Sequence, residues 1–231
     1  MKYIKIVSEK ENTDLGEIKL YDRYGQEISV STESERANLL IDEENVVPKV
    51  ISYMNSTYFD EIYFARSAYQ YVNGIPAMEW VHPPLGKLIQ MLPILILGMT
   101  TFAYRLMGNI AGILMIPLIY VFAKRMFKSR KYAILAAILM TFDTFHFAQT
   151  RMGTVDSFLV LFMIASSYFM YEYLSSNKKT PIKKRLLYLG LCGLFFGLAT
   201  TVKWTGLYLG LGLAILFFGK MILDFKKTKK K

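Results

Sequence analysis

The sequence predicts a mainly α-helical protein that crosses a membrane several times and carries a short β-rich stretch at its N-terminal end. Hydrophobic residues make up 53% of the 231 residues, and in the second half of the chain they gather into long runs. Basic residues separate these runs, which is the bias of cytoplasmic loops in polytopic membrane proteins. From these two observations we expect a multi-pass protein of the cell membrane, with five transmembrane helices and additional interfacial helices.

Residues 1–50 are predicted to form the β-rich end of an extracytoplasmic domain and a linker. Polar and apolar side chains alternate in residues 2–7 and 17–21, and a turn at residues 22–25 leads into a third candidate strand at residues 27–30. Three short strands cannot enclose a core of their own. We therefore expect the domain to begin before this chain does.

Residues 51–105 are predicted to form a catalytic loop with interfacial helices on the outer face of the membrane. The adjacent acids Asp60 and Glu61 follow a Ser-Thr pair, which is typical of the first turn of a helix. Residues 88–101 are apolar, but the run is short and Pro93 interrupts it. We expect this run to lie along the interface, because a crossing would separate the two acids from the polar residues between the later spans.

Residues 106–231 are predicted to cross the membrane five times. They contain 18 Lys and Arg against 4 Asp and Glu, whereas residues 1–105 contain 10 against 14. Membrane topology explains this segregation, so we expect no nucleic-acid partner. Each apolar run approaches the ~20 residues that a spanning helix needs. The runs are residues 106–123, 132–149, 157–174, 186–203 and 204–222.

An odd number of crossings places the N-terminus outside the cell. Residues 1–50 contain neither a signal peptide nor a membrane span. A hydrophilic segment without a targeting signal is hard to export, so we expect a longer protein whose first transmembrane helix precedes Met1. The single cysteine, Cys192, lies in an apolar run, and no disulfide is expected within the chain.

Asp60 and Glu61 are the leading candidates for catalysis. Neighbouring residues on a helix point about 100° apart, so the two carboxylates are not expected to share one proton. One can serve as a general base while the other orients a substrate or a neighbouring cation. The alternative is that both only stabilise a helix N-terminus. The sequence contains no zinc cluster and no cofactor motif, so no cofactor is expected, and a divalent ion at the acid pair stays an open alternative.

His82 and Lys87 lie in the segment that follows, where His82 precedes two prolines at the start of the next predicted helix. We assign both to the binding of the phosphate or sugar of a lipid-linked substrate, because a lysine can meet a phosphate as a point charge. The alternatives are a helix-entry role for His82 and a snorkelling side chain for Lys87.

Arg105, Arg151 and Lys203 lie at the ends of predicted spans opposite to the basic clusters. Ionisable groups at this depth usually have a partner or a function. The phosphate of a lipid would supply a partner, which an arginine can bind in a bidentate manner. We assign the three cations and Asp156 to the same donor site. The alternatives are an ion pair between Arg151 and Asp156, and an interface anchor formed by Lys203 and Trp204.

Five segments then stand out together: residues 58–66 (YFDEIYFAR), 82–87 (HPPLGK), 104–108 (YRLMG), 149–157 (QTRMGTVDS) and 202–206 (VKWTG). In these segments the chain resembles the protein O-mannosyltransferase family, the dolichyl-phosphate-mannose–protein mannosyltransferases, in a bacterial form. The segments follow the family's order, and together they are specific. The chain lacks counterparts of the family's first transmembrane helix and of its C-terminal membrane half.

The resemblance implies a GT-C membrane fold and an enzyme that transfers mannose, with inversion, from a polyprenyl phosphate to Ser or Thr hydroxyls of exported proteins. It implies that Asp60 is the general base and that Arg105 contacts the lipid phosphate, whose charge Arg151 would also screen. It further implies that residues 1–31 are the end of a galactose-binding-like domain. The expected partners are the lipid donor, the acceptor protein and the bilayer.

Two other functions stay open from the sequence. One keeps the fold and the lipid-linked donor but has a lipid or a cell-wall glycan as the acceptor. The other is a membrane transporter or scaffold without catalysis. Transfer activity that depends on Asp60 would distinguish an enzyme from this last class.

Overall fold

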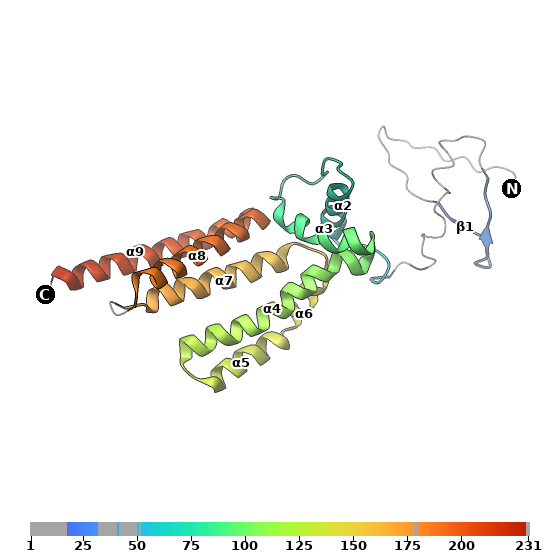
Figure 1. Cartoon of the computed structure of the whole chain (residues 1–231). Helices are drawn as coiled ribbons and strands as arrows, with labels where there is room; N and C mark the ends of the chain where they lie inside the picture. The colour runs from blue at the N-terminus through green and yellow to red at the C-terminus, as the bar shows by residue number, and fades with distance from the viewer. Residues whose placement is uncertain (1–17, 32–40, 42–49, 51, 178–179, 230–231) are drawn as a thin grey trace. The chain divides into compact units, whose positions relative to one another are not determined.

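The computed structural model describes residues 18–31, 41, 50, 52–177 and 180–229 (Figure 1). The chain divides into two compact units, Met1–Ser56 and Thr57–Lys231. The first contains a small hairpin and the second contains all the helices that follow.

The hairpin pairs β1 (Leu20–Tyr21) with β2 (Glu27–Ile28) in antiparallel register. The Asp22 carboxylate caps the turn by accepting hydrogen bonds of 2.8 Å from the backbone amides of Tyr24 and Gln26. Gly25, with φ of 78°, supplies the left-handed conformation that the turn requires. The predicted turn is therefore present with shorter strands, the candidate strand at residues 2–7 lies outside the described residues, and the assignment to a larger β-domain stays a prediction.

The helices of the second unit confirm the predicted mainly α-helical, polytopic class. Among the described residues, four helices are long and apolar enough to cross a membrane, and a bent helix pair makes a fifth when its two helices are taken as one span. The helices are α2 (Glu61–Val72), α3 (Leu85–Leu97), α4 (Thr101–Phe127), α5 (Arg130–Thr141), α6 (Thr144–Arg151), α7 (Asp156–Ser175), α8 (Ile182–Val202) and α9 (Leu207–Lys229), with a 3-10 turn η2 (Trp204–Gly206) before the last.

The second predicted span is broken into α5 and α6, which meet at 55°. Asp143 causes the break because its extended backbone ends the first helix and its carboxylate accepts a 2.6 Å hydrogen bond from the His146 amide. Aspartate is among the best N-cap residues, so a new helix begins here. The expectation of one continuous helix over residues 132–149 is therefore wrong.

Helix α3 has 13 residues and is too short to span a bilayer, since it extends only about 20 Å against a ~30 Å core. Leu88, Leu92 and Leu95 are exposed along one face, while Lys87 and Gln90 are buried on the other. A surface helix of a water-soluble protein has the opposite arrangement, with apolar side chains buried and polar side chains exposed. The interfacial position of the helix stays a prediction.

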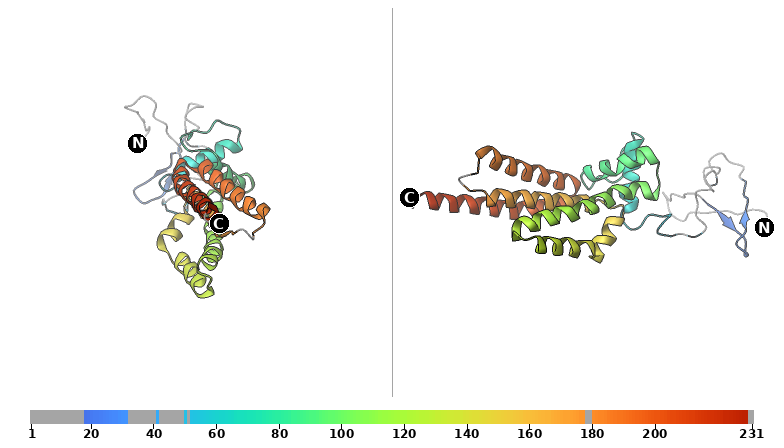
Figure 2. Two further views of the ribbon diagram at one scale, coloured as in Figure 1. Left: turned by 90° about the vertical axis from the view of Figure 1, so that its left-hand side faces the viewer. Right: turned by 60° about the horizontal axis from the view of Figure 1, so that its bottom comes forward.

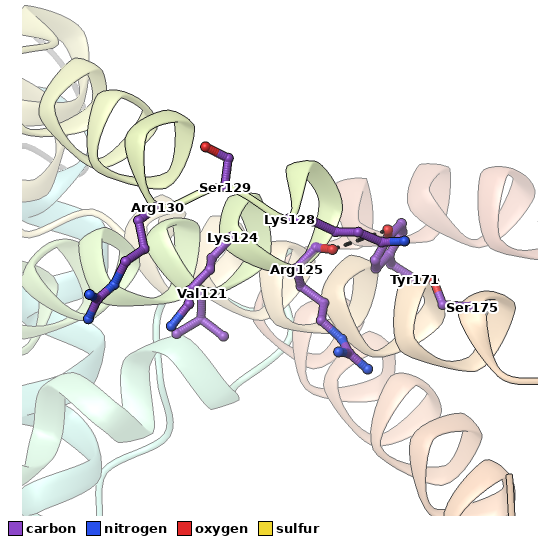
Figure 3. Close-up of a pocket in the computed structure, with 8 residues that line it drawn as sticks. All are labelled: Val121, Lys124, Arg125, Lys128, Ser129, Arg130, Tyr171 and Ser175. Carbon is purple, nitrogen blue, oxygen red and sulfur yellow. Dashed lines mark hydrogen bonds between the residues drawn. The ribbon is translucent and has the colours of Figure 1, made fainter.

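The helices run alongside one another, with α2 and α3 at one end (Figures 1 and 2). At that end an apolar cluster joins Phe64 of α2, Ala111 of α4, Phe158 of α7 and Val202 of α8. The chain reverses between α4 and α5 at the opposite end, where basic side chains gather around the turn (Figure 3). The packing therefore separates a mixed polar end from a basic end.

Gly112 sets how closely α6 approaches α4, because a Cβ atom there would lie 2.6 Å from the Thr150 side chain. We expect Gly112→Ala to lower the stability by about 1–3 kcal/mol through overpacking. Gly193→Ala is the matched control, since nothing lies within 4 Å of its Cβ position and alanine favours the helix. Thermal unfolding in detergent measures both, and equal midpoints for the two variants would contradict this packing.

Candidate functional site

Glu61 is the centre of the polar network at the α2 end of the bundle, and its side chain is fully buried. Arg105 of α4 binds it in a bidentate manner: Nε donates to Oε1 and Nη2 to Oε2, both at 2.7 Å. The backbone amides of Tyr58 and Gly153 also donate to the carboxylate, at 2.6 and 2.5 Å. A charge removed from water requires this degree of compensation. Glu61 therefore joins the segment before α2, helix α4 and the turn after α6.

The turn after α6 is held through the backbone of Gly153. Its amide donates to Glu61, and its carbonyl accepts a 2.6 Å hydrogen bond from Nε2 of the buried Gln90. A Cβ atom at Gly153 would lie 2.6 Å from the Tyr104 ring, so the close approach requires glycine. The hydroxyl of Thr154, next in the chain, is buried and has no hydrogen-bond partner among the described residues.

Asp60 differs from its neighbour in almost every respect. It is half-buried, occupies the N-cap position of α2 without a side-chain capping bond, and its carboxylate has no partner among the described residues. Phe59 before it has a φ of 54°, which is strained for a bulky residue. The two acids therefore have different environments. Glu61 is hydrogen-bonded to Arg105 and orients its guanidinium, whereas the Asp60 carboxylate is available to contact a substrate.

Lys87 lies inside the segment between α2 and α3, with 1% of its side chain exposed. Its ammonium donates to the Glu79 carbonyl at 2.6 Å, to Glu79 Oε2 at 2.7 Å and to the His82 carbonyl at 2.9 Å. These three bonds use every donor that a lysine has. The structure thus places Lys87 in the support of this segment, and its contact with a substrate phosphate stays a prediction.

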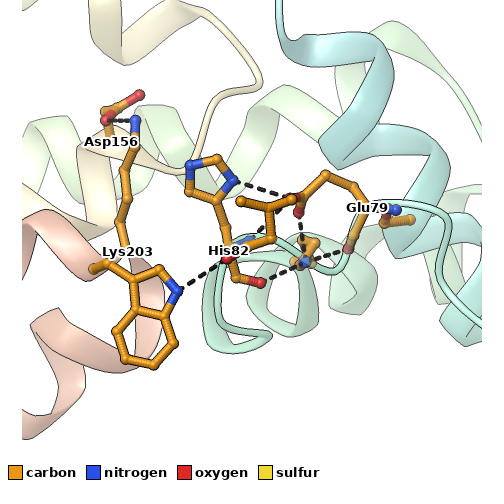
Figure 4. A network of polar contacts seen from close by, with 8 residues as sticks. Glu79, His82, Asp156 and Lys203 are labelled. Carbon is orange, nitrogen blue, oxygen red and sulfur yellow. Dashed lines mark hydrogen bonds and ion pairs between the residues drawn. The ribbon is translucent and has the colours of Figure 1, made fainter.

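Glu79 also positions His82. Its Oε1 accepts from the His82 amide at 2.9 Å and lies 3.0 Å from Nδ1 of the ring. The ring packs edge-on against Phe64 at 5.6 Å between centroids, and its other edge points toward Asp156 and Lys203 (Figure 4). Asp60 is the N-cap of α2, and Phe64 lies one helical turn after it. Residues four apart lie on the same face of a helix, so the contact with Phe64 places His82 on the same face of α2 as Asp60.

Asp156 and Lys203 form an ion pair of 2.9 Å between the start of α7 and the end of α8. The pair is partly exposed, and the adjacent Trp204 donates from its indole Nε1 to the Val81 carbonyl at 2.9 Å. The contact with Val81 ties the end of α8 to the segment that carries His82. Both the cation and the carboxylate of this pair therefore lie close to the Glu79 network.

Arg151 lies at the C-terminal end of α6, which is the favourable end for a cation. Its guanidinium stacks over the Phe147 ring at 4.8 Å, and the residue is exposed. The turn that follows it carries Gly153, so Arg151 is two residues from the Glu61 network. The structure thus brings all the predicted site residues to the end of the bundle where α2 and α3 pack.

Glu79 and Gln90 were not predicted, although the sequence contains signals for both. Glu79 is the only acid between residues 62 and 142. Gln90 and Lys87 are the only polar side chains in α3, and they lie three residues apart on one helical face. Polar residues isolated in apolar surroundings are candidates for buried networks.

The Glu79 network should make this end of the protein sensitive to acid. Burial opposes ionisation of the Glu79 carboxyl, but hydrogen bonds from Lys87 and from the amide and ring of His82 outweigh it and lower its pKa below 4.5. A carboxyl whose pKa is lower in the folded than in the unfolded protein stabilises the fold when the pH is above the unfolded-state pKa. This stabilisation is lost as the pH falls through the folded-state pKa. We therefore expect the segment to loosen below pH 4.5.

Tryptophan fluorescence reports on this loosening, because Trp80 lies in the segment, Trp204 is bonded to it, and the sequence has no other tryptophan. Glu79→Gln is the control, since glutamine cannot titrate. The wild-type protein should show an acid transition in this range that the variant lacks. A transition of equal size in both proteins would show that other carboxyls cause it.

No group of three or more His, Cys, Asp or Glu residues suited to a metal ion is found in the described part of the chain. The polar end combines an acid, Asp60, whose carboxylate has no partner in the described part of the chain, with several cations that have different degrees of exposure. Such a site can accept a proton and can screen the charge of an anionic group.

The chain is similar to a family of mannosyltransferases and to individual bacterial members of it. The model of the dolichyl-phosphate-mannose-protein mannosyltransferase family matches residues 81–230. The polyprenol-phosphate-mannose–protein mannosyltransferase of Mycolicibacterium smegmatis is 26% identical over 196 residues, which are 75% of this chain and 37% of the relative. That of Corynebacterium glutamicum is 31% identical over 169 residues, which are 65% of this chain and 31% of the relative.

The similarity extends to eukaryotes, because protein O-mannosyl-transferase 1 of Mus musculus is 24% identical over 195 residues, which are 75% of this chain and 26% of that protein. The chain spans about a third of the length of the two bacterial relatives and about a quarter of that of the mouse protein. A comparison with solved structures found no match. Since the family model covers more than half of the chain, the chain belongs to the dolichyl-phosphate-mannose-protein mannosyltransferase family.

Proposed function

We propose that this chain carries the catalytic end of a membrane enzyme that transfers mannose from a polyprenyl-phosphate donor to Ser or Thr hydroxyls of exported proteins. Membership of the family and the printed names of its relatives support the donor and the protein acceptor. The observation that carries the proposal is the division of the acid pair, in which Glu61 is fully hydrogen-bonded and Asp60 has no partner among the described residues.

In the proposed reaction, Asp60 accepts the proton of the acceptor hydroxyl. The hydroxyl oxygen forms a bond to the anomeric carbon of mannose on the face opposite to the phosphate, and the bond from that carbon to the phosphate oxygen breaks. Its electron pair leaves with the lipid phosphate, which is already a good leaving group. The configuration at the sugar carbon is inverted, and the chemistry needs no cofactor.

The cations have different proposed roles. Arg151 is exposed, and Lys203 is partly exposed beside Asp156, so both are suited to contact the donor phosphate directly. Glu61 fixes the plane of the Arg105 guanidinium, which gives this cation a defined orientation toward the same anion. In this proposal His82 contacts the sugar. The contacts of Glu79 with His82 and Lys87 support a role for Lys87 as a residue that positions His82.

The proposed site lies on the outer face of the cell membrane. The basic residues of the α4–α5 turn and of the C-terminal part of α9 are at the other end of the helices, which is the cytoplasmic end by the charge bias. An extracytoplasmic site would give the enzyme access to proteins during or after export. It would also place the exposed apolar face of α3 at the outer interface.

The test is an in vitro transfer assay with the purified chain, labelled polyprenyl-phosphate mannose and a Ser/Thr-rich peptide. We expect label in the peptide and none in a matched peptide with alanine at every Ser and Thr. A lipid or glycan acceptor labelled in place of the peptide would keep the donor chemistry but contradict the acceptor. Failure of the wild-type chain to transfer mannose to any of these acceptors would contradict the proposed function.

A further inference from the structure

A cavity of ~670 Å³ lies at the basic end of the bundle, opposite to the proposed catalytic end. It is formed by the C-terminal turns of α4 and α7 and by the first residues of α5 (Figure 3). This volume falls within the range of sites for small molecules, which is about 300–1,000 Å³. The lining residues are Val121, Lys124, Arg125, Lys128, Ser129, Arg130, Tyr171 and Ser175.

The charge of the cavity is strongly positive, because four of its lining residues are Lys or Arg and none is acidic. Arg125 is compensated by Glu172, to which its Nη2 donates at 3.1 Å. Lys124 lies over the Tyr120 ring at 5.9 Å, and no carboxylate partner is found for Lys124, Lys128 or Arg130 among the described residues. The side chains of Lys124 and Arg130 extend to the same side of the helices (Figure 3).

The helix termini add to this positive potential. Helix α5 begins at Arg130, and its N-cap residue Ser129 makes no side-chain capping bond. The amides of a helix N-terminus carry a partial positive charge, so a cation placed there is unfavourable unless an anion is also present. The hydroxyls of Ser129, Tyr171 and Ser175 supply uncharged hydrogen-bonding groups around the cavity.

An apolar surface leads away from the cavity along α4 toward the middle of the span. Val121 lines the cavity and is exposed, and Leu114, two turns earlier on the same face, is also exposed. A soluble phosphate compound would have no use for this surface, whereas the acyl chains of a lipid would cover it. The combination of a basic cavity and an adjoining apolar stripe therefore favours a lipid.

We propose that this cavity binds the phosphate headgroup of an anionic phospholipid in the cytoplasmic leaflet. Lys124 and Arg130, whose side chains extend to one side, would contact the phosphate, and the acyl chains would lie along Val121 and Leu114. Lys128 would add positive charge from the side of the cavity where Tyr171 lies (Figure 3). Such a site is distinct from the donor site at the other end of the helices. It holds a structural lipid at a defined position and goes beyond a general attraction of basic loops to anionic membranes.

The test uses the full 231-residue chain in neutral detergent and measures the binding of short-chain phosphatidylglycerol by native mass spectrometry, with short-chain phosphatidylcholine as the reference lipid. We expect one saturable phosphatidylglycerol site and weaker binding of phosphatidylcholine. The double variant Lys124→Ser, Lys128→Ser should bind phosphatidylglycerol about tenfold or more weakly, because one contact to the headgroup and a second positive charge of the cavity are lost. Arg130→Gln is a second, independent variant with the same expected direction.

The matched control is the double variant Lys131→Ser, Lys183→Ser, which removes the same charge from exposed residues that do not line the cavity. Its affinity should stay within about twofold of the wild type, as expected for surface charges outside the site. Equal losses in the two double variants, or equal binding of the two lipids, would overturn the site. Displacement by inorganic phosphate at the concentration of the lipid would overturn the assignment to a lipid. Elution volume and thermal unfolding verify that each variant is folded.

Discussion

Replacing Asp60 with asparagine should lower the rate of mannosyl transfer by a factor of about 10²–10⁴, which is the usual contribution of a general base. Asparagine keeps the size and the N-cap position of the side chain but cannot accept the proton of the acceptor hydroxyl. Because Asp60 makes no side-chain capping bond in α2, its loss should leave the fold unchanged. The rate constant at saturating donor is the relevant measurement.

The affinity for the donor distinguishes a variant that has lost only the general base from one whose donor site is damaged. A group that acts only in the transition state changes the rate and not the binding of the ground state, so the affinity of the Asp60→Asn variant for polyprenyl-phosphate mannose should stay within about twofold of the wild type. The matched control is Glu61→Gln, which should lower the thermal unfolding midpoint because it weakens the bidentate contact with Arg105. Transfer at the wild-type rate by Asp60→Asn would remove Asp60 from the mechanism.

Long helices could be predicted from the sequence because a membrane span is a local property of about 20 apolar residues. All the expected spans correspond to helices, and only the second one is divided. The reason for the division was present in the sequence, since Asp143 is an acid inside an apolar run and aspartate caps helices well. The overall hydrophobicity of residues 132–149 favoured the prediction of one continuous span over that of a helix break at Asp143.

The different roles of the two acids could not be predicted in the same way. They are adjacent in sequence, and either residue type can act as a base or hold a cation. What separates them is a pair of contacts to Glu61 from residues 44 and 92 positions later, Arg105 and Gly153. Contacts at such separations depend on how α4 and the turn after α6 pack against α2, and a single sequence does not contain that geometry.

Breaking the ion pair between Glu61 and Arg105 should cause one of the largest losses of stability in the chain. The Glu61 side chain is fully buried and 9% of the Arg105 side chain is exposed, so removing one partner leaves the other charge in a poorly solvated site. Such changes cost about 3–5 kcal/mol. We therefore expect Arg105→Met to lower the free energy of unfolding by this amount, measured by denaturant titration in detergent.

The double variant Glu61→Gln, Arg105→Met should be more stable than the single Arg105→Met variant, because no unpaired charge then remains in the core. The ion pair between Asp156 and Lys203 is the natural comparison, since 39% and 22% of its side chains are exposed. Asp156→Asn should cost only about 0–1 kcal/mol. If Arg105→Met were as mild as Asp156→Asn, the bidentate pair would not be what holds the acid motif to α4. Asp60 would then lack the fixed support that its proposed role requires.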